Sequence, residues 1–268
     1  MKKLKNYSML CTAILSLFIL ITSCSNEEVD EIISDESLVD SKDDLELDDD
    51  PELKAAWKVF EISDFYIETS WLSGENSRST SSFSSTSIDN ESWYDKDSNG
   101  YYTMKSLKTD GNRSEWKEKN QSSLYSGKKM TYLAKVESIP ENGVTIAQVH
   151  NRGNGVNRPW LRVYIDDDRK IKIKVTTNNP SNSSGTYKTF TGGTYSQGSN
   201  YILSITYLGN KATVKVKKTN GTVLIEETIT PTSSWNNYSN TYYFKAGVYT
   251  EGDDKQPKIT FRYFYFDD

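Results

Sequence analysis

The chain has 268 residues, 35% of them hydrophobic, and its 37 acidic and 32 basic residues give a net charge of −5 at pH 7. A single His and two Cys exclude disulfide-rich and zinc-thiolate proteins. The charge is uneven: residues 1–50 carry 13 acidic and 4 basic residues, whereas residues 51–268 carry 24 acidic and 28 basic ones. The mildly basic part suits a polyanion, and no nucleic-acid-binding motif accompanies the charge, so we expect no nucleic acid partner.

The amino terminus predicts an exported protein with a lipid anchor. Residues 1–24 combine a basic start, an apolar run from Met9 to Ile21 and a small-residue end, which is typical of a secretory signal and not of a transmembrane helix. The last four of these residues resemble a bacterial lipobox, which makes Cys24 the expected lipidation site. An ordinary cleaved signal is the alternative. We therefore expect attachment to the outer membrane, with the protein on the cell surface.

Residues 25–53 are acidic and almost without aromatic residues, so they bury too little apolar surface to fold and predict a disordered tether. The start of this segment, Ser25–Glu28, resembles the export signal of surface lipoproteins in Bacteroidetes-type bacteria. A merely solvating linker is the alternative. Residues 54–268 are long enough for one folded domain, which we expect to be monomeric.

Alternation with a period of two recurs along this domain and predicts an all-β fold of two packed sheets, a sandwich or jelly roll. Residues 160–165 predict a strand that separates a core face from a polar, aromatic surface; the surface residues are Trp160, Arg162 and Tyr164. An acidic turn, Asp166–Asp168, leads into a second strand at 170–175, and the pair predicts a hairpin. The turn could suggest calcium, but a solvated turn is the ordinary interpretation, and we expect no metal.

Further strands are predicted at 201–207 and 212–216. Another strand is predicted to follow the Asn220-Gly221 turn, and the last one lies at 258–266. Two polar stretches, 151–159 and 176–200, interrupt the alternation. They are predicted to be long loops, which often act as lids or binding loops.

Two segments of alternating sequence carry residues suited to proton transfer. In the first, Gln148 and His150 share one strand face. In the second, a shared face carries Lys245, Gly247, Tyr249 and Glu251, opposite an apolar face. Gly247 is predicted to leave room there for a ligand to approach the backbone.

Together with Arg113–Lys117, these segments resemble the three signature blocks of the alginate lyases of polysaccharide lyase family 7, and they occur along the chain in the same order as in that family. The blocks are an Arg-x-Glu-Leu-Arg-like strand, a Gln-Ile/Val-His strand and a Tyr-Phe-Lys-Ala-Gly-x-Tyr-x-Gln strand. The resemblance implies a concanavalin-like β-jelly roll whose concave sheet forms a substrate groove. The chain departs from the blocks at Trp116, where Leu is usual, at Lys117, where Arg is usual, and at Glu251, where Gln is usual.

The resemblance also implies residue roles. Arg113, Gln148, His150 and Tyr249 would form the catalytic group. Glu115 and Lys245 would support it, and they are expected among the substrate-binding residues, which also include Trp160, Arg162, Tyr164 and Glu251. No cofactor or metal is implied. Glu251 would place a negative charge near an anionic substrate. This departure bears on the identity of the substrate more than on the type of reaction.

β-Elimination explains why such residues are needed. The reaction removes the C5 proton beside a uronate carboxylate and expels the C4 oxygen, so the carboxylate must be neutralised by donors such as Arg113 and Gln148. Tyr249 would be the acid, and it would need nearby cations, Lys245 and Arg113, to act as a base. In the family, the Gln-Val-His form is associated with mannuronate, and guluronate cleavage with His as base.

Other functions remain open at this stage. A surface glycan-binding lipoprotein without activity would need the aromatic and cationic residues, but it would not need His150 and Tyr249. A lyase for another polyuronate is the second alternative. A glycoside hydrolase is not indicated, because the Glu-x-Asp-x-Glu strand of such sandwiches is missing, and no Gly-x-Ser-x-Gly elbow indicates a serine hydrolase.

Overall fold

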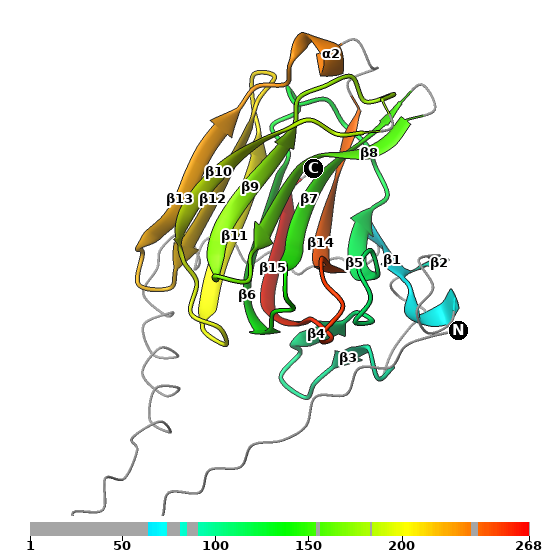
Figure 1. Ribbon diagram of the computed structural model, residues 1–268, viewed down its shortest axis with the longest axis vertical. Helices are drawn as coiled ribbons and strands as arrows, with labels where there is room; N and C mark the ends of the chain where they lie inside the picture. The colour runs from blue at the N-terminus through cyan, green and yellow to red at the C-terminus, as the bar shows by residue number, and fades with distance from the viewer. Residues whose placement is uncertain are drawn as a thin grey trace, which may run out of the picture. The chain divides into compact units, whose positions relative to one another are not determined.

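The computed structural model describes residues 64–73, 81–84, 91–153, 156–182, 184–236 and 241–267. Within them the chain forms two antiparallel sheets with only short helical turns, which confirms the predicted all-β jelly roll (Figure 1). No helix in these ranges is long and apolar enough to span a membrane. The predicted signal segment with Cys24, the tether and the domain boundary at residue 54 lie outside the described residues.

The first sheet, sheet A, places the three blocks next to one another. Its described strands lie in the order β10 (Tyr187–Thr194), β9 (Lys170–Thr176), β8 (Val156–Ile165), β7 (Val144–Gly153), β14 (Tyr242–Thr250), β5 (Arg113–Glu118), β1 (Phe65–Thr69) and β2 (Ser81–Ser84). The block strands β7, β14 and β5 are therefore consecutive. We call the face of sheet A that points away from the core its outer face.

The second sheet, sheet B, covers the inner face of sheet A. Its described strands lie in the order β13 (Val223–Ile229), β12 (Ala212–Lys218), β11 (Asn200–Tyr207), β6 (Lys129–Ser138), β15 (Lys258–Asp267), β4 (Tyr102–Lys105) and β3 (Tyr94–Lys96). Two short turns, η3 (Trp71–Ser73) and α2 (Ser233–Asn236), are the helical elements of the described residues.

The core between the sheets is built from the apolar positions of the alternating strands. Trp116, one of the departures from the family blocks, is fully buried there, with its ring 4.6 Å from that of Phe261 and 5.1 Å from that of Phe264. Such aromatic packing contributes about 0.5–1.5 kcal/mol per pair beyond the area buried. The change to Trp116 therefore concerns core packing and leaves the outer face unaltered.

The predicted hairpins β8–β9 and β11–β12 and the strands β13 and β15 are confirmed. The predicted loops are wrong in large part. Residues 151–159 lie mostly within the paired ends of β7 and β8, and residues 176–200 contain β10. β10 is an edge strand whose side chains are mostly exposed, so it needs no regular apolar alternation, and its Gly192-Gly193 pair further weakens the strand signal.

Trp160 was predicted on the substrate-facing surface, and this is wrong. The pairing of β7 with β8 shifts register there, with Val149 opposite Leu161 but His150 opposite Pro159. The extra residue, Trp160, turns into the core, where it is 0% exposed and its ring lies 5.3 Å from that of Tyr242. A β-bulge breaks the period-two alternation on which the prediction depended.

Candidate active site

Cross-strand pairing brings the three sequence blocks together on the outer face of sheet A. Tyr249 on β14 lies directly opposite Arg113 on β5, and Lys245 lies between Lys117 on β5 and Gln148 on β7. Directly opposite residues share a face and lie within side-chain reach. The four predicted catalytic residues, Arg113, Gln148, His150 and Tyr249, therefore occupy one surface formed by three adjacent strands.

Arg113 lies against Tyr249, with its guanidinium carbon 4.8 Å from the centre of the phenol ring. Burial raises the pKa of Tyr249; Arg113 lowers it, while the negative charge of Glu251 raises it, and the net change is upward. Of the two cations named as candidates for lowering the pKa of Tyr249, Arg113 does so, but its effect is smaller than that of burial. Tyr249 holds its proton firmly, which suits an acid.

A hydrogen-bonded series fixes the orientation of His150. Gln148 donates its amide Nε2 hydrogen to the carboxylate of Glu115, so its Oε1 faces His150 Nε2 at 3.0 Å. A carboxylate only accepts, so this amide orientation is the one that satisfies both partners. His150 must then donate from Nε2, and its neutral tautomer carries the proton-accepting lone pair on Nδ1. Gln148 thus positions His150 in this structure.

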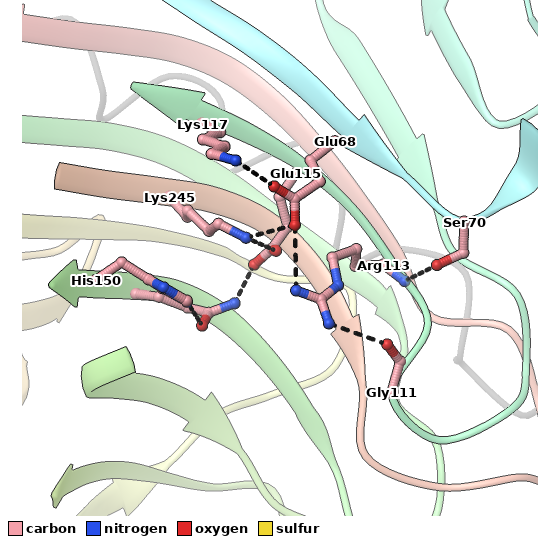
Figure 2. Close-up of polar contacts among 9 residues, drawn as sticks. Glu68, Ser70, Gly111, Arg113, Glu115, Lys117, His150 and Lys245 are labelled. Carbon is pink, nitrogen blue, oxygen red and sulfur yellow. Dashed lines mark hydrogen bonds and ion pairs between the residues drawn. The ribbon is translucent and has the colours of Figure 1, made fainter. Parts of the chain in front are cut away.

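Glu68, which no sequence motif indicated, lies on β1 at the centre of the cationic cluster. Glu68 Oε1 is 3.2 Å from Arg113 Nη1 and 2.9 Å from Lys245 Nζ, and its Oε2 is 2.8 Å from Lys117 Nζ (Figure 2). Lys245 Nζ also lies 3.2 Å from Glu115 Oε2. One buried carboxylate therefore holds three cationic side chains in place.

Burial alone would raise the pKa of Glu68, but the charge of Lys245 and the hydrogen bonds from Lys117 and Lys245 outweigh burial and hold its pKa well below the usual range. Glu68 is thus ionised at neutral pH. The alternation of Phe65 and Ile67 with Tyr66 and Glu68 could have indicated a strand. Nothing in the sequence, however, indicates that β1 pairs with β5 and so brings Glu68 to the site.

Two residues expected to contact substrate are enclosed. Glu115 and Lys245 are each 1% exposed and are hydrogen-bonded to Gln148 and Glu68, which is the arrangement expected of residues that support the catalytic group. Gly247 is predicted to leave room for a ligand. With φ at 155°, a Cβ there would lie 2.3 Å from the backbone oxygen of Ser114, so the structure gives a different reason for the glycine, the close approach of β5.

Glu251 does not present an isolated negative charge to a substrate. Its Oε1 accepts hydrogen bonds from Arg162 Nη1 at 2.9 Å and from Thr145 Oγ1 at 2.6 Å. Arg162 therefore neutralises the acidic departure from the family block. Arg162 and Tyr164 are half-buried on the outer face, on the strand next to the one that carries Gln148 and His150.

The acidic turn Asp166–Asp168 contains the single group of three carboxylates that the described ranges bring close enough to share an ion. Asp166 Oδ1 accepts the backbone hydrogen of Lys170 at 2.7 Å, and Lys172 forms an ion pair with Oδ2. Its carboxylate thus serves the hairpin turn, while Asp167 and Asp168 are exposed. The geometry fits the ordinary interpretation of a hairpin turn.

The fold has close counterparts among solved structures. Alginate lyase A1-II', described as a member of polysaccharide lyase family 7, superposes with a TM-score of 0.61 at 18% identity, over 78% of this chain and 96% of that one. Alginate lyase AlyC3 gives 0.62 at 20% identity over 77% and 90%. The alginate lyase from Klebsiella pneumoniae gives 0.61 at 15% identity over 78% and 96%. These similarities show a shared fold.

No curated protein matches the chain in sequence. The model of the family described as alginate lyase, in contrast, matches residues 60–266, which is nearly the whole predicted catalytic domain. The matched region contains all three blocks and every catalytic residue that the resemblance implied. The chain belongs to the alginate lyases, the polysaccharide lyases of family 7 whose jelly roll it shares.

Proposed function

We propose that this protein cleaves alginate by β-elimination, leaving an unsaturated uronate at the new chain end. The observation that carries the proposal is the cluster on β1, β5 and β14, in which three cations, Arg113, Lys117 and Lys245, face two carboxylates, Glu68 and Glu115. The cluster carries one more positive than negative charge, and its Arg113 packs against the ring of Tyr249. A uronate carboxylate would balance the excess charge.

Arg113 is the residue placed to bind that carboxylate. Its side chain is partly exposed, and its buried Nε hydrogen has no acceptor among the described residues. An unsatisfied buried donor costs about 1–3 kcal/mol, which a carboxylate acceptor would recover. Neutralising the carboxylate lets it take up the electrons released when the C5 proton leaves, so Arg113 would lower the barrier to proton removal.

Proton transfer divides between two residues in this proposal. Tyr249, protonated at rest, donates to the departing C4 oxygen. For guluronate, whose C5 proton lies on the opposite face, neutral His150 takes the proton on Nδ1. The Gln148-Val149-His150 sequence favours mannuronate bonds, for which Tyr249 would serve as both base and acid. Substrate binding must then lower the raised pKa of Tyr249 before Tyr249 can act as the base.

Solved relatives support alginate as the substrate class. AlyC3 is described in complex with dimannuronate. Alginate lyase A1-II' is described with the product GGG when one Tyr is replaced, and with the substrate GGMG when a His and a Tyr are replaced. The same two residue types lie on the outer face of sheet A here, as His150 and Tyr249.

Replacing the base should separate the two bond types. We expect His150→Ala to lower cleavage of polyguluronate at least tenfold more than cleavage of polymannuronate, because only the opposite-face proton depends on His150. Both rates are measured on the same preparation, so a loss of folded protein would lower both equally and leave their ratio unchanged. Equal losses on both polymers would show that His150 acts as a general structural element of the site.

The activity itself is tested by incubating the protein with polymannuronate, polyguluronate and other polyuronates and following the ultraviolet absorbance of the new double bond. We expect absorbance to rise with alginate polymers. Tight binding to alginate without any rise would favour the surface glycan-binding alternative. A rise with another polyuronate alone would assign a different substrate.

We further propose that Cys24 carries a lipid that anchors the protein in the outer membrane with the domain at the cell surface. The lipobox-like Ile21–Cys24 sequence supports this, and two acyl signals are what stable anchoring requires. Cys24→Ser should move the protein from the membrane fraction to the soluble fraction without changing its specific activity. An unchanged distribution would reject the anchor.

A further inference from the structure

The site described above continues along the outer face of sheet A as a row of directly opposed residues. Gln148 on β7 lies opposite Arg162 on β8, and Arg162 lies opposite Lys174 on β9. Next to Lys174, the edge strand β10 adds Tyr187, which pairs with Thr176 and so shares the outer face (Figure 1). The row thus leads from the catalytic strands towards the edge of the sheet.

Two like charges face each other in this row. Arg162 and Lys174 are a directly opposite cross-strand pair, an arrangement that destabilises a sheet. Arg162 is compensated by Glu251, but Lys174 forms no ion pair with any residue in the described ranges. Burial and the charge of Arg162 lower the pKa of Lys174, with Glu251 opposing them. The fold therefore places a cation without an ion-pair partner among the described residues directly opposite another cation.

An exposed aromatic ring accompanies the pair. Tyr187 is 45% exposed, and its ring centre lies 4.6 Å from Lys174 Nζ and 5.9 Å from the guanidinium carbon of Arg162. The ring holds both cations on the outer face by cation–π attraction. It also offers an apolar face to a sugar ring whose carboxylate meets the cations.

We propose that Lys174, Arg162 and Tyr187 form a distal subsite that binds the carboxylate and ring of a uronate several sugars away from the bond that is cut. This rests on the proposed function, since it assumes a polyuronate chain at the catalytic group. Tyr249 and Lys174 lie three strands apart, so about 14 Å separates their backbones at the usual strand spacing of ~4.8 Å. A short oligosaccharide cut at Tyr249 does not reach the subsite, whereas a long chain does.

The test compares chain lengths. Lys174→Gln should raise KM for a long-chain polyuronate about tenfold, the loss expected for one charge-assisted hydrogen bond at a partly exposed site, and leave kcat unchanged. Its kcat/KM for a uronate trisaccharide should equal that of the unaltered protein. Tyr187→Ala should act in the same direction. Thermal stability should not fall, because Lys174→Gln removes a like-charge contact.

Lys188→Gln is the matched control. Lys188 follows Tyr187 in the same strand and loses the same charge, but it pairs with the core residue Val175 and so points to the other side of the sheet. Unchanged long-chain KM in Lys174→Gln, or an equal loss on trisaccharide and polymer, would overturn the subsite. If the unaltered protein eliminates no polyuronate, the proposed function fails, and the affinity of each variant for a long polyuronate still tests the subsite.

Discussion

Tyr249→Phe should reduce turnover on alginate by about 10² to 10⁴, the usual contribution of a general acid or base. The change removes the hydroxyl but retains the ring, which continues to pack against the guanidinium of Arg113 at 4.8 Å. Substrate affinity and thermal stability should therefore change little. The measurement is kcat from the initial rate of double-bond formation, with affinity for the polymer measured separately.

Tyr125→Phe provides the control, because Tyr125 is exposed outside the catalytic strands and loses the same hydroxyl. It should retain normal turnover. If Tyr249→Phe keeps near-normal elimination, another group supplies the proton, and the carry-over from the family block fails at this position. Loss of activity together with loss of the fold would instead make Tyr249 a structural residue.

Glu68→Gln should destabilise the protein by about 3 kcal/mol and lower turnover by about 10²-fold. Removing this charge leaves Arg113, Lys117 and Lys245 facing Glu115 alone, and unpairing buried charges typically costs about 3–5 kcal/mol. Arg113 also loses its 3.2 Å contact, and misplaced catalytic groups commonly cost 10²-fold in rate. Denaturant unfolding and steady-state kinetics measure the two effects.

Acid provides a second readout of Glu68. Because its folded pKa is depressed, its stabilisation is complete above the unfolded value of about 4.3 and is lost as the pH falls further. The stability difference between the unaltered protein and Glu68→Gln should therefore shrink below about pH 4. Glu226→Gln, which breaks an exposed ion pair with Lys215 on sheet B, should cost at most about 1 kcal/mol. Equal costs for the two variants would contradict the central position of Glu68.

The sequence predicts much of this fold because most strands are half-buried and alternate. Leu161, Val163 and Ile165 reveal β8 in this way, and they are fully buried. Prediction fails where alternation is absent or broken. The edge strand β10 is mostly exposed and packs only Phe190 against the core, and the bulge at Trp160 turns a residue from the outer face into the core.

The residues of the candidate site fall into the same two groups, those that the sequence indicates and those that it does not. The sequence blocks identify Arg113, Gln148, His150 and Tyr249, because short motifs preserve residues whose chemistry cannot be exchanged. Glu68 could not be found, because its importance comes from strand pairing between β1 and β5, which lie far apart in the sequence. Long-range register is set by the whole sheet and leaves no local signal in the sequence.

Mass analysis of the products from a polymannuronate and a polyguluronate digest tests the central claim most directly. β-Elimination adds no water, so each cut should give a fragment that ends in an unsaturated uronate and is lighter by one water than the hydrolysis product. We expect one unsaturated non-reducing end for each bond cut, on one of the two fragments, and a loss of these ends in Tyr249→Phe. Cuts in which both fragments have saturated ends, with the mass of one water added per cut, would contradict β-elimination, and so would polymer that is bound but uncut.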